Sequence, residues 1–92
     1  MIKSFRHKGI EKLYKTGSKA GILAEHEKRL RLIVAHLNLA TEPREMGLPG
    51  LQLHALTGKL RGFWSVSVSG NWRVIFRFQD QDAYDVDYLD YH

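Results

Sequence analysis

Apolar side chains in the first 40 residues recur at steps of three and four, the spacing of a helix that buries one face. The spacing predicts a short helix over residues 9–16, which Gly17 would end, and a longer helix over residues 22–40. Residues 41–50 contain two prolines and two glycines, so we expect a loop that leads from the helices to the rest of the chain.

After residue 50 the period changes to two, which is typical of strands with one buried face. It predicts strands over residues 64–69 and 72–78, joined by the two-residue turn Gly70-Asn71. A polar turn over residues 79–82 then leads to a last strand that runs to the C-terminus. Two shorter strands are also expected, at residues 51–54 and, as an edge, at residues 2–5. Two N-terminal helices followed by a small, mostly antiparallel sheet predict an α+β fold, and the length predicts a single domain of residues 1–92.

The alternation also predicts which side chains share a face of the sheet. One face is expected to form most of the core and carries Trp64, Trp72, Phe76, Phe78 and Tyr84. Arg73 and Arg77 alternate with these aromatic residues and therefore belong to the opposite face. Because a charged group at the centre of a sheet needs water or a partner, we expect this second face to be solvent-exposed and a candidate for a cleft.

The charge is unevenly distributed along the chain. There are 14 Lys and Arg against 10 Asp and Glu, a net charge of +4 with neutral histidines. Residues 1–36 hold nine basic and three acidic side chains, a net of +6, whereas residues 37–92 have a net of −2. A basic half is consistent with a polyanionic partner, because contacts with phosphates release counterions. A solvated helical surface explains the charge equally well.

Several classes of protein are excluded or disfavoured. The absence of cysteine excludes disulfides, thiolate metal sites and cysteine nucleophiles. The five histidines have no metal-ligand spacing, and no phosphate-binding glycine loop or nucleophile elbow occurs, so we expect no metal and no cofactor. No apolar run approaches the roughly 20 residues of a membrane span, and no signal peptide is evident, which favours a cytoplasmic protein.

The remaining candidates for chemistry are His54, Arg73 and the terminal Asp90, Tyr91 and His92. RNA cleavage without a metal needs a base for the 2′-hydroxyl, an acid for the leaving 5′-oxygen and a cation for the phosphate. Histidine can serve as either acid or base, and arginine is a permanent bidentate phosphate donor. By spacing alone, His92 is explained better as an ordinary terminal residue and His54 as an ordinary loop or strand histidine, so spacing establishes no role for either.

The sequence resembles the HigB toxins of bacterial toxin–antitoxin systems, within the RelE-like ribonuclease superfamily. The resemblance covers essentially the whole chain. It is carried by MIKSFRHKGIEKLY at the start, LATE at 39–42, LQLHALTGKLRGFWSVSV at 51–68, NWRVIFRF at 71–78 and DAYDVDYLDYH at 82–92.

The resemblance implies a RelE-like fold and an endoribonuclease that cuts mRNA in the A site of the 70S ribosome and so inhibits translation. The family's catalytic residues match His54, Arg73, Asp90, Tyr91 and His92. Arg73 would bind the scissile phosphate, while the two histidines would share the acid and base roles in an order that stays open. Some relatives have a lysine where this chain has Thr57, and nearby Lys59 or Arg61 could supply that charge.

The resemblance also implies partners. RNA or ribosome contacts are expected from six basic residues: Lys8, Lys12, Lys15, Lys59, Arg61 and Arg77. A helix-turn-helix antitoxin of the HigA type would neutralise the toxin, and the complex alone would bind operator DNA. The alternative function is a RelE- or ParE-like toxin without ribonuclease activity, which acts by binding DNA gyrase or nucleic acid, because a fold by itself does not determine an activity.

Overall fold

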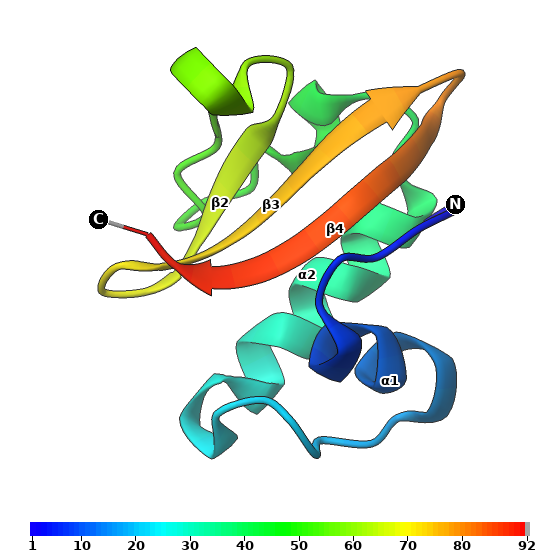
Figure 1. Ribbon diagram of the computed structural model, residues 1–92, viewed down its shortest axis with the longest axis vertical. Coiled ribbons are helices and arrows are strands. Elements are labelled where there is room, and N and C mark those ends of the chain that lie inside the picture. Colours follow the sequence, from blue (N-terminus) through cyan, green and yellow to red (C-terminus); the bar gives the residue numbers. More distant parts are fainter. Residues whose placement is uncertain (92) are drawn as a thin grey trace.

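The computed structural model describes residues 1–91, and in it two α-helices pack with a four-stranded sheet (Figure 1). The bounds are α1 Lys8–Thr16, α2 Glu27–Leu39, β1 His54–Ala55, β2 Trp64–Ser69, β3 Trp72–Gln79 and β4 Asp82–Asp90. The strands lie side by side in chain order, and each neighbouring pair is antiparallel. The α+β expectation of two N-terminal helices on a mostly antiparallel sheet is therefore confirmed.

Local chemistry sets the ends of the helices. The His7 ring caps the start of α1, because its Nδ1 accepts the backbone N–H groups of Gly9 at 3.0 Å and Ile10 at 3.2 Å. Gly17 ends α1 in the left-handed conformation with φ of 77°, as expected. The second helix begins at Glu27 rather than at residue 22, because residues Ala24–His26 form a separate 3-10 turn.

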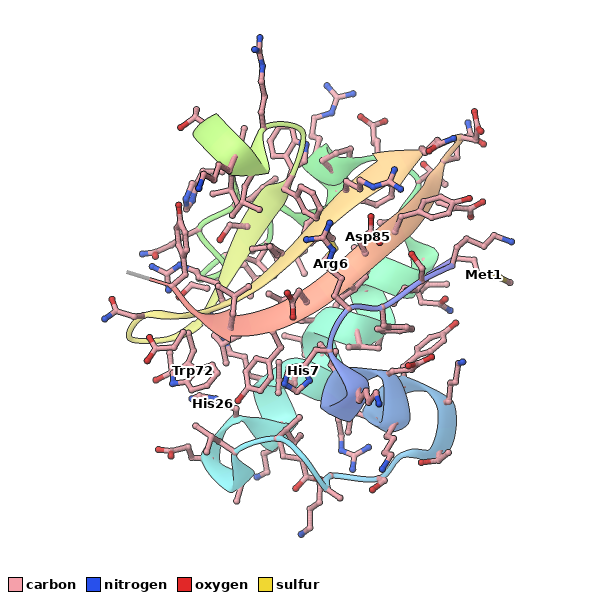
Figure 2. The ribbon with its side chains drawn as sticks, viewed as in Figure 1. Met1, Arg6, His7, His26, Trp72 and Asp85 are labelled. Atoms are coloured by element: carbon pink, nitrogen blue, oxygen red, sulfur yellow. The ribbon has the colours of Figure 1, made fainter. Side chains whose placement is uncertain are left out.

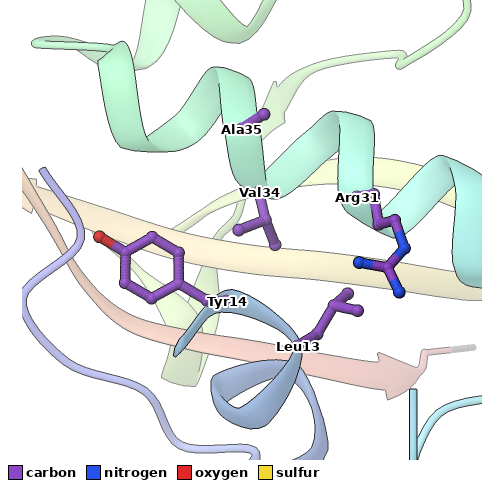
Figure 3. A pocket seen from close by; sticks show the side chains of 5 residues that line it. All are labelled: Leu13, Tyr14, Arg31, Val34 and Ala35. Carbon is purple, nitrogen blue, oxygen red and sulfur yellow. The ribbon is translucent and has the colours of Figure 1, made fainter. Parts of the chain in front are cut away.

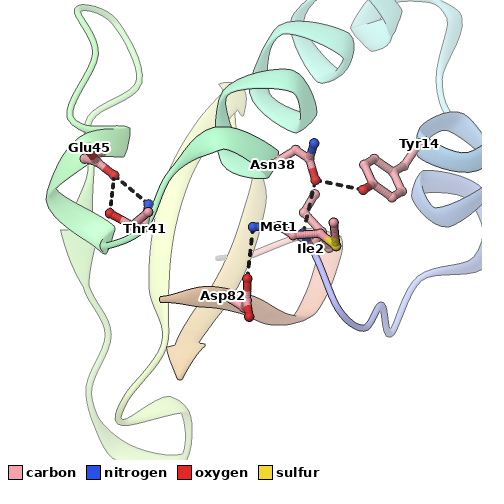
Figure 4. Close-up of polar contacts among 7 residues, drawn as sticks. All are labelled: Met1, Ile2, Tyr14, Asn38, Thr41, Glu45 and Asp82. Atoms are coloured by element: carbon pink, nitrogen blue, oxygen red, sulfur yellow. Dashed lines mark hydrogen bonds and ion pairs between the residues drawn. The ribbon is translucent and has the colours of Figure 1, made fainter. Parts of the chain in front are cut away.

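The N-terminal segment forms the expected edge beside β4. Ile2 and Phe5 make isolated parallel bridges to Ala83 and Val86, so this edge is parallel whereas the four named strands are antiparallel. The segment is further fixed by Asn38 of α2, whose Oδ1 accepts the Ile2 N–H at 3.2 Å (Figure 4). The N-terminal segment therefore pairs with β4 at two points, outside the four named strands.

The main core lies between the helices and one face of the sheet. Its fully buried side chains include Ile10, Leu30, Ile33, Leu37, Val66, Val74, Phe76 and Val86. Trp64, Trp72 and Phe78 pack partly against it, as the alternation predicted. In Figure 1, α2 runs behind the sheet, and α1 lies beside α2 below β4.

Tyr84 departs from the prediction that it belongs to this core. A bulge interrupts the pairing of β3 and β4 between Ile75 and Arg77, and Asp85 adopts a positive φ of 55° there. The extra residue shifts the alternation, so that Tyr84 pairs with Arg77 while Ala83 and Val86 are both buried on the helix side. Tyr84 therefore lies on the opposite face.

The prediction for that opposite face is partly wrong. At its centre, Ile75 is 1% exposed and packs with Leu56, Phe63, Leu60 and Leu89 in a second apolar cluster. The chain between β1 and β2 makes this possible, because it folds back over the sheet and places Leu56 and Phe63 there. The face is thus partly covered, and its arginines lie on either side of an apolar centre.

The connection between α2 and the sheet is a structured loop. Residues Pro43–Met46 form a 3-10 turn that buries Met46 completely. Glu45 closes the turn by accepting hydrogen bonds from the Thr41 backbone N–H and hydroxyl, which lower the pKa of its carboxyl (Figure 4). The expected strand at residues 51–54 is shorter and lies at His54–Ala55. Within residues 1–91, no helix has the length and apolar character to cross a membrane.

Candidate active site

His54 is placed by the short strand β1 at the edge of the sheet. It pairs with Ser65 of β2, and its imidazole is exposed. Its Nδ1 lies 3.1 Å from the carbonyl oxygen of Gln52. Since a carbonyl only accepts, this contact assigns the proton to Nδ1 and leaves Nε2 as the acceptor of the neutral ring.

Arg73 lies on β3 near the Gly70-Asn71 turn. Its Nη1 donates to the carbonyl oxygens of Gly70 at 2.7 Å and Trp72 at 3.1 Å, and it lies 3.4 Å from the Ser67 hydroxyl. These acceptors are neutral, and none of the ion pairs found within residues 1–91 includes this guanidinium. They orient the side chain without neutralising its charge, which suits a group that binds phosphate.

The strand pairing brings His54 and Arg73 to the same face. His54 lies opposite Ser65, which lies opposite Ile75, and Arg73 is two residues from Ile75 on β3. Two strand spacings, about 10 Å, separate the strands that carry them. The face they share is the one with the second apolar cluster, and we call it the open face because no α-helix of the described chain packs on it.

Ser65 lies on the open face between His54 and Ile75, so the expectation of a solvent-exposed second face applies to it as well. Instead it is fully buried, and its hydroxyl has no hydrogen-bond partner among the described residues. The surface of the sheet next to His54 is therefore less accessible to water than the sequence predicts.

The chain end divides between the two faces. Asp90 pairs with Trp72, whose side chain packs on the helix side of the sheet. Asp90 also makes another contact besides this strand pairing. The ladder continues past it, since the Tyr91 N–H donates to the Asn71 carbonyl at 2.8 Å. The alternation then gives Tyr91 the side of Leu89 and Arg73. His92 lies outside the described residues.

The expected basic residues near the site are found on the chain that covers the open face. Lys59 lies in the 3-10 turn Gly58–Leu60 and Arg61 directly follows it, and both side chains are exposed. Thr57 precedes the turn and is exposed as well. Two positively charged groups are thus available in the same short segment that follows His54.

The three lysines of the first helix lie elsewhere. Lys8, Lys12 and Lys15 are exposed on α1, at the opposite end of the molecule from the turn with Lys59 in Figure 1. Lys15 is paired with Glu11 at 2.8 Å. The six basic residues predicted to contact RNA or the ribosome therefore form two separate groups.

The cavity between the helices is separate from these groups. It has a volume of about 240 Å³ and is lined by Leu13, Tyr14, Arg31, Val34 and Ala35 (Figure 3). Apart from Arg31 and the Tyr14 hydroxyl its lining is apolar, and that hydroxyl donates to Asn38 at 2.7 Å. It offers no histidine or carboxylate for proton transfer, so we place the candidate active site on the open face. Within residues 1–91, no three His, Asp or Glu side chains gather to hold a metal ion.

Comparisons with known proteins agree with this class of fold. The family model for HigB-like toxins, described as the RelE-like toxin of the type II toxin–antitoxin system HigB, matches residues 3–92. The chain therefore belongs to the HigB-like toxin family, which implies an antitoxin partner. A curated protein from Proteus vulgaris, Endoribonuclease HigB, is 40% identical over 92 residues, which cover all of both chains.

Proposed function

We propose that this protein is an endoribonuclease toxin that cuts mRNA in the ribosomal A site without a metal ion. The observation that carries the proposal is the placement of His54 and Arg73 on the same face of the sheet, with the exposed cations Lys59 and Arg61 in the segment that follows β1. Family membership and the relative named as an endoribonuclease support the same conclusion. The alternative of gyrase binding offers no role for an acid–base histidine on the same face as an oriented arginine.

The reaction is a transesterification within the RNA. A base removes the proton of a 2′-hydroxyl, the freed oxygen attacks the adjacent phosphorus, and the bond from phosphorus to the 5′-oxygen breaks. An acid gives a proton to that 5′-oxygen, which leaves a cyclic phosphate and a 5′-hydroxyl. His54 and His92 share these two roles, and Arg73 donates to the phosphate oxygens as negative charge accumulates in the transition state.

The remaining residues have supporting roles. Tyr91 follows the alternation onto the side of Arg73 and contacts the substrate from there. Asp90 holds a neighbouring group from the other side of the strand end. Lys59 or Arg61 provides the charge that some relatives provide with a lysine at position 57. Protein groups alone can perform every proton transfer and charge stabilisation in this scheme.

The proposed setting is the cytoplasm, with the ribosome and its mRNA as substrate. Lys59, Arg61 and Arg77 lie on or beside the open face and would contact mRNA. Lys8, Lys12 and Lys15 on α1 would contact ribosomal RNA. A helix-turn-helix antitoxin of the HigA type would hold the toxin inactive, and operator DNA would be bound through that complex.

The first prediction tests this proposal on ribosome-bound mRNA by primer extension. Arg73→Ala and removal of His92 are each expected to lower the cleavage rate at least 100-fold, the typical contribution of one general acid–base or charge-stabilising group, about 10²–10⁴. Arg44→Ala is the matched control, because Arg44 is exposed, paired with Glu42 and not among the residues given a role in cleavage. Cleavage at the wild-type rate in both site variants would contradict the proposal, and inhibition of supercoiling by the purified protein would favour gyrase binding.

A further inference from the structure

Two arginines on the open face share one carboxylate. Arg77 Nε lies 2.8 Å from Asp85 Oδ2, and Arg6 Nε lies 4.0 Å from Asp85 Oδ1. Arg6 comes from the N-terminal edge segment, and Arg77 and Asp85 come from β3 and β4. Figure 2 shows Arg6 and Asp85 side by side over the sheet. We call these three residues the arginine–aspartate triad.

An aromatic ring supports each guanidinium. Arg6 lies over the ring of Phe63 at 4.9 Å, and Arg77 lies over the ring of Tyr84 at 5.0 Å. A stacked guanidinium keeps its N–H groups in its own plane, where they can still donate to an anion. The side chains of Arg6, Arg77 and Asp85 retain 49%, 34% and 29% of their exposure, so a ligand can reach them.

The bulge in β4 creates this arrangement. Asp85 adopts a φ of 55°, and its N–H donates to the Ser4 hydroxyl at 2.8 Å. The extra residue lets Tyr84 and Asp85 both reach Arg77, although regular alternation would put consecutive residues on opposite faces. The triad could not be read from the sequence because it depends on this shift and on the N-terminal edge.

The triad carries a surplus positive charge, since two guanidinium groups face a single carboxylate. It lies on the same face of β3 as Arg73, four residues along the strand, which is about 13 Å. Asp87, opposite Ile75, lies on β4 between the two positions and adds a negative charge there. Arg73 and the triad thus form two cationic positions along one strand.

We propose that Arg6 and Arg77 bind a backbone phosphate of single-stranded RNA, and that Asp85 competes with this phosphate and so sets the affinity. Paired arginines bind phosphate through several N–H groups. The choice of RNA as the ligand rests on the proposed function, whereas the anion site rests on the triad itself. The Asp85 carboxylate thus pairs with the two arginines when no phosphate is bound to them.

The second prediction measures binding of a short single-stranded RNA that is 2′-O-methylated throughout and so cannot be cut. Asp85→Asn is expected to tighten binding about threefold to tenfold, because it removes a negative charge near the bound phosphate. Asparagine tolerates the positive φ at this position, so the bulge is expected to persist. Arg6→Gln is expected to weaken binding by a similar factor and to reduce the slope of log affinity against log salt by about 0.7.

Glu27 provides the matched control, since it also faces two cations, Arg31 at 2.9 Å and Lys19 at 3.9 Å, but belongs to α2. Glu27→Gln makes the same change in net charge and is expected to alter RNA binding less than twofold. Equal tightening in Asp85→Asn and Glu27→Gln, or unchanged binding in Arg6→Gln, would overturn the proposal. The uncleavable RNA reports binding alone, so the two proposals can fail separately. Absence of the expected changes in RNA binding, with mRNA cleavage intact, would contradict only this inference. The expected changes in binding, with no mRNA cleavage by the wild type, would contradict only the proposed function.

Discussion

His26 and Tyr88 form a buried polar pair on the helix side of the sheet. His26 is 4% exposed and Tyr88 is 3% exposed, and His26 Nδ1 lies 2.7 Å from the Tyr88 hydroxyl. The Trp72 ring covers both, with its centroid 5.6 Å from that of His26 and 4.8 Å from that of Tyr88 (Figure 2). This histidine is a structural residue, in contrast to the exposed His54.

Tyr88 carries the third prediction. Burial raises the pKa of its phenol above the ordinary value of 10.0, so the folded protein resists ionisation more than the unfolded chain. The resulting stability is fully present below pH 10 and is lost as the pH rises through the raised pKa. Tyr88→Phe is expected to be about 1–3 kcal/mol less stable at pH 8, because His26 loses its partner, and to lose less further stability by pH 11.

Urea unfolding at pH 8 and at pH 11 measures both effects. Tyr91→Phe is the control for removal of a phenol hydroxyl, since Tyr91 is 42% exposed. If wild type, Tyr88→Phe and Tyr91→Phe all lost the same stability between the two pH values, the role given to buried Tyr88 would be wrong.

At the scale of elements, the first turn of α1 is fixed by a close backbone contact. A methyl group at Gly9 would lie 2.5 Å from the Gly21 carbonyl oxygen and 2.8 Å from the His7 ring. Gly21 belongs to the loop after α1 and has a φ of 90°. The loop therefore crosses directly over the start of the helix, where His7 also provides the cap.

The fourth prediction concerns Gly9→Ala. Helix propensity alone would make alanine about 1 kcal/mol more stable than glycine within a helix. The steric clash of the alanine methyl group with the Gly21 backbone outweighs this gain in stability. We therefore expect a net loss of about 1–3 kcal/mol in the free energy of unfolding. Lys12→Ala, at an exposed position of α1, is expected to change stability by less than about 0.5 kcal/mol. A denaturation midpoint for Gly9→Ala at or above the wild-type value would refute the contact.

At the scale of the whole molecule, the six basic residues predicted to contact RNA or the ribosome lie in two separate regions. One group lies on or beside the open face, with Lys59 and Arg61 on the chain between β1 and β2 and Arg77 on β3, and the other lies on α1. A single short RNA strand on the open face would contact only the first group. A partner as large as the ribosome can contact both, which is the use we propose for the lysines of α1.

The fifth prediction separates these two groups by co-sedimentation with ribosomes across a range of salt. The double variant Lys8→Gln, Lys12→Gln is expected to bind ribosomes more weakly and to reduce the salt slope by roughly one to two. Its control, Lys19→Gln with Arg44→Gln, removes the same charge from cations already paired with Glu27 and Glu42. The same weakening in both double variants would point to net charge alone.

Much of the fold could be predicted from the sequence because helices and strands have different hydrophobic periods. The bounds of α1, the two tight turns and the core positions of Trp64 and Phe76 follow from that local pattern. The start of α2 could not be predicted, because residues 22–26 continue the helical spacing of apolar residues. In the structure, Ala24–His26 form a 3-10 turn, and the His26 ring contacts the Tyr88 hydroxyl. The face of Tyr84 could not be predicted either, because the alternation of apolar and polar residues does not reveal a β-bulge.

The sequence by itself determined the types of group available for chemistry and the strand parity that puts Arg73 and Arg77 on the second face of the sheet. Only the tertiary structure decided that this face has an apolar centre, that His54 shares it, and that Arg6 and Asp85 meet Arg77 there. Parity depends on neighbours along the chain and can be read from it. Contacts between strands depend on register, bulges and folded-back segments, which are set by residues far apart in the chain.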